Sequence, residues 1–431
     1  MYSQFVIVQG NSSGKSLIRG GHHPAIRAAR PRRGRIRPSF RPGKSGRPCL
    51  NRAPVLETVM SPTRRTYLTA LATTTVLTVA GCSSSESPTE TPAVTTTPGV
   101  SEPTTDGTTD RPETDTRGGD LPSYADRAAY TEESLSLEAT EECSLGATLT
   151  LPEGDGAVPG VVIVHGSGPN DRDGTVGPLQ PYRDLAVGLA SRGIAVLRYD
   201  KRTFACQQSI DPTAFTIDDV VTEDVLTAVS RLREQPRVDR EDIVVVGHSL
   251  GGALAPRVAS RDGGLAGIAL LAANARPLPD LIVDQTRYAL ERDGELTDAE
   301  RRRLEQTRAL AERLRTADIG DEEVLAGGGE PFWRSLAEYD QVETATAIET
   351  PILLAQGERD RQVTVADDLS RWRDTLGDRT DVRIHTYPGL NHYFVDGAGA
   401  LETGGQPEDG FVAESLIADL ADWIEGVVEA A

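Results

Sequence analysis

Short uninterrupted apolar runs alternate with amphipathic stretches from about residue 121 to the end of the chain. Apolar runs bounded by turn residues predict buried strands, and a 3.6-residue period predicts helices. The predicted strands are 161–164, 194–198, 243–246, 266–271, 352–355 and 382–387. The predicted helices are 182–192, 217–233, 253–260, 366–376 and 411–428. Strands that are apolar on both faces and alternate with helices predict an α/β fold with a mostly parallel, doubly covered sheet.

Residues 275–345 interrupt this alternation. Two charged, Arg/Glu-laced helical patterns occur at 281–292 and 297–317. We therefore expect a helical cap inserted between two parts of one core, 121–274 and 346–431. A solvated helical hairpin that makes no contact with substrate is the alternative.

The N-terminal region has the layout of an export signal preceded by a basic leader. Residues 1–59 contain twelve Lys+Arg and one acid without apolar periodicity, which predicts disorder. Residues 60–82 contain Arg64-Arg65, a short apolar run and Val-Ala-Gly-Cys ending at Cys82, the order of a twin-arginine lipoprotein signal peptide. Because signal peptides begin a chain, we expect translation to start at Met60, with residues 1–59 a wrongly assigned extension. A genuine basic leader is the alternative.

Residues 83–120 are rich in Ser, Thr, Pro and acids and predict a disordered tether. Together with lipidation at Cys82, this predicts a protein held by an N-terminal lipid anchor on the extracellular face of the cell membrane.

Charge and cysteine content limit the kinds of partner and metal site that the chain is expected to have. Residues 82–431 carry 31 Lys+Arg against 64 Asp+Glu, a net charge of −33, and their single lysine is Lys201. Such a polyanion argues against nucleic acid as a partner and resembles exported proteins of salt-adapted archaea, although an ordinary acidic protein is the alternative. Cys143 and Cys206 either form a disulfide or remain free thiols. Without CxxC or His/Cys clusters, no metal site is expected.

The predicted strand 243–246 leads into Gly-His-Ser-Leu-Gly at 247–251 and then into a helix. Strand, tight turn and helix with serine at the apex is the nucleophile elbow, which exposes the hydroxyl of Ser249. A β-carbon at Gly247 or Gly251 is expected to clash with the packed strand and helix. The positive end of the following helix faces Ser249, where negative charge develops in acyl transfer.

A serine nucleophile needs a base and a carboxylate that orients the base. His392 follows the predicted strand 382–387, and Asp360 follows strand 352–355, so both are expected at the carboxyl edge of the sheet. The order Ser249, Asp360, His392 is the chain order of this triad on an α/β sheet. We assign His392 as base and Asp360 as acid. The weaker candidates for the acid are Glu358, Asp367 and Asp368, of which the last two are interpreted as helix caps and dipole partners.

The oxyanion hole requires two backbone N–H groups. We expect one from Leu250, directly after the nucleophile, and the other from Ser167 in the His-Gly-Ser turn after strand 161–164, with Gly168 as the alternative.

Four motifs, His-Gly after a strand, Gly-His-Ser-Leu-Gly-Gly, Gly-Glu-Arg-Asp and Gly-Leu-Asn-His, together resemble the α/β-hydrolase superfamily over about residues 130–430. The sequence from 164 to 173, with Arg-Tyr-Asp-Lys-Arg at 198–202, resembles most a branch of secreted hydrolases that is dienelactone-hydrolase-like, or close to the catalytic domains of prolyl oligopeptidases and serine aminopeptidases. The nucleophile is serine and not cysteine, so the dienelactone substrate is not implied.

The resemblance and the triad predict a serine esterase that acts on a small-molecule ester without a metal or organic cofactor. A serine peptidase or amidase and a non-catalytic surface lipoprotein are the alternatives. Acyl and alcohol specificity and oligomeric state have no sequence signal.

Overall fold

The computed structural model of the protein describes residues 120–430. The predictions for the leader (1–59), the signal peptide with Cys82 (60–82) and nearly all of the tether (83–120) therefore lie outside the described residues. None of the helices between residues 120 and 430 combines the length and the apolar character needed to cross a membrane.

An eight-stranded sheet organises the described chain, with strand order β1-β2-β4-β3-β5-β6-β7-β8. Strands β1 and β2 form an antiparallel hairpin, β2 is antiparallel to β4, and all further pairings are parallel. This topology confirms the predicted α/β-hydrolase fold with a mostly parallel sheet. The strand bounds are β1 (Tyr130–Thr140), β2 (Cys143–Pro152), β3 (Val158–Val164), β4 (Ala195–Tyr199), β5 (Val238–His248), β6 (Gly267–Leu271), β7 (Ile352–Gly357) and β8 (Val382–Tyr387).

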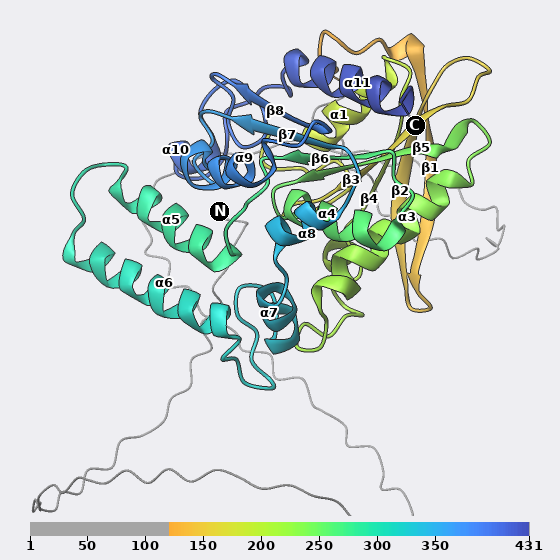
Figure 1. Cartoon of the computed structure of the whole chain (residues 1–431). Coiled ribbons are helices and arrows are strands. Elements are labelled where there is room, and N and C mark those ends of the chain that lie inside the picture. Colours follow the sequence, from red (N-terminus) through yellow and green to blue (C-terminus); the bar gives the residue numbers. More distant parts are fainter. Residues whose placement is uncertain (1–119, 431) are drawn as a thin grey trace, which may run out of the picture. The chain divides into compact units, whose positions relative to one another are not determined.

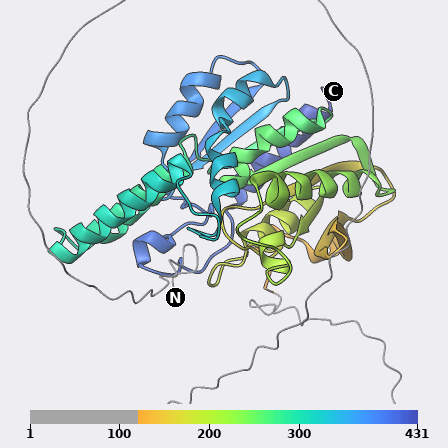
Figure 2. The ribbon, with the colours of Figure 1, turned by 90° about the horizontal axis from the view of Figure 1, so that it is seen from below.

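Helices cover both faces of this sheet (Figures 1 and 2). Successive strand residues point to opposite faces, so Val161 and Ile163 pack in one core layer and Val162 and Val164 in the other. The first layer includes α1 (Pro181–Ala190) and α11 (Glu414–Val428). The second includes α3 (Glu223–Arg233), α4 (Leu250–Asp262) and α9 (Ser370–Leu376). Wide helical turns, Asp218–Thr222 and Val365–Leu369, precede α3 and α9; shorter helices are Arg127–Ala129, α2 (Arg202–Ala205) and α10 (Ala400–Thr403).

Packing on the α11 face is close. Trp423 is buried, and a β-carbon at Gly267 of β6 would lie 2.7 Å from its indole ring. Glycine at this position therefore lets the ring lie directly on the strand.

Four helices lie between β6 and β7: α5 (Leu278–Glu291), α6 (Asp298–Thr316), α7 (Glu330–Ala337) and α8 (Gln341–Ala347). Figures 1 and 2 show α5 and α6 side by side, extending away from the sheet. Thr297 and Glu300 form a reciprocal capping box that satisfies N–H groups at the start of α6.

The start of this helical segment is fixed to the core by Asp368. This residue lies in the first helical turn after Thr364, as its interpretation as a cap and dipole partner expects, and its Oδ2 accepts the Thr364 N–H at 3.3 Å. Asp368 is fully buried and accepts hydrogen bonds from the backbone N–H groups of Ala275 and Arg276. It also pairs with the Arg276 guanidinium at 2.9 Å. The N-cap is Thr364, whose hydroxyl accepts the N–H of Asp367 at 3.1 Å. A helix-initiating pattern cannot reveal that a carboxylate turns inward toward an arginine 92 residues away.

Cys143 and Cys206 form a disulfide, which settles the alternative left by the sequence. Cys143 begins β2 and Cys206 follows α2, so the bond joins the edge hairpin to the connection after β4. Both residues are buried.

Candidate active site

Ser249 lies between β5 and α4 with φ 55° and ψ −122°, outside the regions that non-glycine residues normally adopt. The surrounding backbone leaves no room for neighbouring side chains. A β-carbon at Gly247 would lie 2.3 Å from the Gly251 carbonyl oxygen, and one at Gly251 would lie 2.3 Å from the Val164 carbonyl oxygen. Both expected clashes are therefore confirmed. Ser249 itself is only partly buried, at the apex of the turn.

Asp360 and His392 form a buried pair at the ends of β7 and β8. Asp360 Oδ2 lies 2.7 Å from His392 Nδ1, and the two residues are 2% and 5% exposed. Asp360 Oδ1 accepts the N–H groups of Gln362 and Val363, at 2.7 and 3.0 Å. Gln356 Nε2 donates to Oδ2 at 2.9 Å. These contacts hold the carboxylate as an acceptor for the Nδ1–H of His392. The other ring nitrogen, Nε2, is therefore not bonded to Asp360.

Ser249 and His392 line the same small cavity of about 20 Å³, together with Gly166, Ser167, Tyr182 and other residues. The structure thus brings together the serine, the histidine and, through its hydrogen bond, the carboxylate that the sequence singled out. Two of the other acidic candidates have different partners: Asp368 binds Arg276, and Asp367 contacts Thr364.

The turn after β3 is held by side-chain hydrogen bonds. Asn170 Nδ2 donates to the carbonyl oxygens of Gly166, Ser167 and Gly168, at 3.3, 3.2 and 3.0 Å. Arg172 pairs with Asp200 at 2.8 Å. Over the described part of the chain, neither Ser167 N–H nor Leu250 N–H has a hydrogen-bond acceptor. These two N–H groups are therefore available to a ligand.

A hydrogen-bond relay connects this turn to the histidine loop. His248 Nε2 lies 2.9 Å from the His392 carbonyl oxygen, which can only accept, so Nε2 carries the proton. Burial lowers the pKa of His248 to about 3, so the ring is neutral and its Nδ1 is an acceptor. The Tyr182 hydroxyl therefore donates to Nδ1 at 3.1 Å and accepts the N–H of Gly166 at 3.0 Å. One tyrosine and one histidine thus join the turn after β3 to the backbone of His392.

Neither of the two remaining described histidines contacts Asp360. His165 is buried edge-on against Tyr182 and Tyr199, and burial lowers its pKa to about 3. His385 contacts Asp419 at 3.1 Å.

Two apolar cavities adjoin the site and share the wall formed by Leu250, Leu278 and Trp333. One, of about 130 Å³, begins at Ser167 and Leu250 and is lined further by Lys201, Thr203, Phe215, Val220, Val221 and Phe332. The other, of about 100 Å³, includes Leu314 and Tyr339. The indole N–H of Trp333 donates to the Leu325 carbonyl at 2.8 Å, which fixes the ring between the two cavities. Helices α5, α6 and α7 of segment 275–345 therefore contribute walls beside the site.

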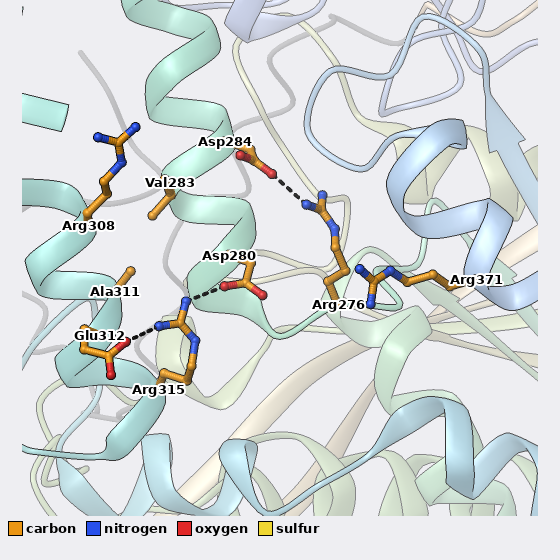
Figure 3. Close-up of a pocket in the computed structure, with 9 residues that line it drawn as sticks. All are labelled: Arg276, Asp280, Val283, Asp284, Arg308, Ala311, Glu312, Arg315 and Arg371. Carbon is orange, nitrogen blue, oxygen red and sulfur yellow. Dashed lines mark hydrogen bonds and ion pairs between the residues drawn. The ribbon is translucent and has the colours of Figure 1, made fainter. Parts of the chain in front are cut away.

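A larger cavity of about 430 Å³ lies between α5 and α6, and neither Ser249 nor His392 lines it. Figure 3 shows Arg315 bonded to Asp280 and Glu312, and Arg276 bonded to Asp284. Most of the charged side chains that line this cavity pair with one another, whereas the two cavities beside Ser249 are lined mainly by apolar side chains. Among residues 120–430, no group of three or more His, Cys, Asp or Glu side chains is arranged to hold a metal ion.

Sequence reasoning missed Tyr182 and the bridging role of His248. His248 stands next to the proposed nucleophile and is buried. Its contact with the His392 carbonyl joins residues 144 positions apart, for which a single sequence carries no signal.

A strained serine at a strand-to-helix turn, beside a carboxylate–histidine pair at the strand ends of this sheet, defines a hydrolase of the α/β class. Residues 161–409 match the alpha/beta hydrolase family, and the chain belongs to it. It is 36% identical over 305 residues to Esterase EstD of Thermotoga maritima, covering 71% of this chain and 70% of that protein.

Two solved structures are similar at lower identity. Est1E from Butyrivibrio proteoclasticus is 16% identical, with a TM-score of 0.45 over 69% of this chain and 99% of its own. An esterase of Pyrococcus furiosus is 14% identical, with a TM-score of 0.45 over 69% and 91%.

Proposed function

We propose that the protein hydrolyses carboxylic esters through an acyl-enzyme. Ser249 Oγ attacks the ester carbonyl while His392 takes its proton, and Asp360 holds the histidine ring and stabilises its cation. The N–H groups of Leu250 and Ser167 stabilise the oxyanion. His392 then protonates the leaving alcohol, and water cleaves the acyl-enzyme by the same steps. The observation that carries this proposal is the 2.7 Å bond between Asp360 and His392, in a site that His392 shares with the strained Ser249.

The apolar cavity of about 130 Å³ supports an apolar group on one side of the ester bond. It begins at Ser167 and Leu250, the two donors assigned to the oxyanion, so a carbonyl held there directs one substituent into it. Phe215, Phe332 and Trp333 also line it. Ester cleavage is favoured over amide cleavage by the similarity to Esterase EstD.

The test is turnover of p-nitrophenyl esters of increasing acyl length, measured in low and in molar salt, with the matching arylamides. We expect ester turnover that Ser249→Ala abolishes, whereas Ser260→Ala, an exposed serine on the same helix α4, retains it. A fluorophosphonate probe is expected to label wild type and Ser260→Ala but not Ser249→Ala. Turnover by Ser249→Ala, preferential release of arylamide, or failure of the probe to label Ser249 would each overturn the proposal.

We also propose that the enzyme works outside the cell, anchored by lipid on Cys82 after export by the twin-arginine route. The Cys143–Cys206 disulfide supports an oxidising compartment. The test is detergent-phase partitioning of the native protein. Wild type is expected in the detergent phase and Cys82→Ser in the aqueous phase, and a mature protein whose N-terminus precedes Cys82 would contradict the proposal.

A further inference from the structure

We propose that Lys201 is a positioning residue of the oxyanion site, because its ammonium group holds the Gly166 carbonyl and thereby aims the Ser167 N–H at the substrate oxygen. This inference rests on the proposed function, since it assigns a role within the same reaction.

One peptide unit links the lysine contact to the proposed oxyanion donor. The Gly166 carbonyl and the Ser167 N–H belong to the same planar trans peptide group, so they point in opposite directions. Lys201 Nζ donates to the Gly166 oxygen at 2.7 Å, and Asn170 Nδ2 approaches the same oxygen at 3.3 Å. Fixing the oxygen on one side of the peptide fixes the N–H on the other side.

The neighbouring peptide is held as well. The Gly166 N–H donates to the Tyr182 hydroxyl at 3.0 Å. Gly166 approaches the nucleophile so closely that an added β-carbon would lie 3.3 Å from the β-carbon of Ser249. Gly168, two residues on, has φ +83°. A turn this rich in glycine has little intrinsic stiffness, so the direction of the Ser167 N–H depends on its side-chain contacts.

The ammonium group also acts on the electronic character of this peptide. A hydrogen bond from a charged donor is about twice as strong as a neutral one, and it polarises the group that accepts it. Pulling electron density toward the Gly166 oxygen makes the Ser167 N–H a stronger donor. The effect is greatest in a site of low dielectric, and Lys201 is only 5% exposed.

Burying a charged group costs free energy unless other groups compensate it, so the buried ammonium of Lys201 needs a structural or functional explanation. Burial lowers the pKa of Lys201 to about 8, while Asp224 of α3 acts in the opposite direction. Asp224 is already paired with Arg202, whose Nε lies 3.1 Å from the carboxylate. His165, the other titratable group that interacts with Lys201, is kept neutral by burial. Every other cation among residues 82–431 is an arginine, so the lysine here is not a matter of general composition.

Lysine suits this contact because it is a compact point charge for one carbonyl, whereas arginine presents a planar fork.

The positive charge on the Lys201 ammonium depends on pH. Lys201 is protonated below about pH 8 and loses its charge as pH rises through that value, so the stabilisation of the oxyanion weakens there.

The experiment compares Lys201→Met, Lys201→Arg and the control Arg373→Met, which removes an exposed cation of α9, in p-nitrophenyl ester hydrolysis. We expect Lys201→Met to lower kcat about 100-fold with KM within about threefold, since the loss falls on the transition state. Lys201→Arg keeps a charge and is expected to recover at least part of the lost kcat. Arg373→Met is expected to match wild type.

The pH profile separates positioning from a merely structural role. In wild type, kcat is expected to fall as pH rises through about 8, and in Lys201→Arg this alkaline decrease is expected to disappear, because the guanidinium stays charged. Active enzyme is counted by exhaustive fluorophosphonate labelling, and folding is checked by thermal unfolding. If Lys201→Met does not fold, the profile of Lys201→Arg carries the test.

The inference is wrong if Lys201→Met keeps kcat within twofold of wild type, or if the alkaline decrease is unchanged in Lys201→Arg. Either result, with Ser249→Ala inactive, leaves the proposed function intact. Failure of the wild type to hydrolyse any ester is the distinct result that removes the proposed function itself.

Discussion

The Tyr182 hydroxyl donates to Nδ1 of His248, 3.1 Å away, and through this contact two loops of the site share one support. The same hydroxyl accepts the Gly166 N–H, and the opposite nitrogen of His248 binds the His392 carbonyl. The backbone at Gly166, beside the proposed oxyanion donor, and the backbone of His392, the proposed base, are therefore placed relative to each other by two side chains. Both are buried, so water cannot readily replace either contact.

Removing the Tyr182 hydroxyl leaves the Gly166 N–H and His248 Nδ1 without partners. An unsatisfied buried polar group costs about 1–3 kcal/mol, so we expect Tyr182→Phe to lower the free energy of unfolding by about 2 kcal/mol. It is also expected to lower kcat about tenfold, because the two loops lose their common support. Denaturant unfolding and ester turnover measure these effects. Tyr288→Phe on α5 is the control, and equal stability of both variants would contradict the role of the relay.

Asp360→Asn tests the carboxylate that binds His392. Asparagine keeps the shape but presents an amide donor to a position that accepts hydrogen bonds from Gln356, Gln362 and Val363. In serine proteases the equivalent change lowers kcat about 10⁴-fold by favouring the wrong histidine tautomer, and we expect a comparable loss. The exposed Asp367→Asn is expected to keep its activity. A kcat for Asp360→Asn within tenfold of wild type would show that Asp360 does not orient the base.

Gly247→Ala places a methyl group 2.3 Å from a backbone oxygen, which has no freedom to move aside. Overpacking usually costs about 1–3 kcal/mol, and we expect at least the upper end of this range because the clash is with backbone. Gly156→Ala, in a loop where nothing lies within 4 Å of the added carbon, is the matched control. Urea unfolding and fluorophosphonate labelling of Ser249 are the readouts. Wild-type behaviour of Gly247→Ala would mean that the elbow is looser than its geometry indicates.

The disulfide closes a loop between cysteines 63 positions apart. The chain-entropy model assigns about 4 kcal/mol to a loop of this length. The double variant Cys143→Ala with Cys206→Ala is expected to lose about this free energy of unfolding. Reductant is expected to destabilise wild type to the level of the double variant and to leave the double variant unchanged. If reductant has no effect on wild type, the bond contributes little to stability.

The sequence was most informative where local pattern and position in the fold coincide. Consecutive β-branched residues at 243–246 predict a buried strand, and the glycines around Ser249 predict its tight turn, because both depend on near neighbours. His392 and Asp360 could be selected because parallel strands end at one edge of the sheet. The pairing of Asp368 with Arg276 was not predicted, because an acid at a helix start has the same local pattern whether or not its carboxylate also binds a distant cation. Which partner a buried polar side chain finds, as for Tyr182 and Lys201, depends on contacts across distant segments.

Trp333 separates two cavities beside Ser249. Its indole is the shared wall between cavities of about 100 and 130 Å³, and the Leu325 carbonyl holds it in place. Replacing this one residue by a small one joins the two compartments without touching Ser249, Asp360 or His392. For the proposed ester hydrolysis, a change at this one residue is therefore expected to alter the volume available to the substrate while the proposed catalytic residues stay unchanged.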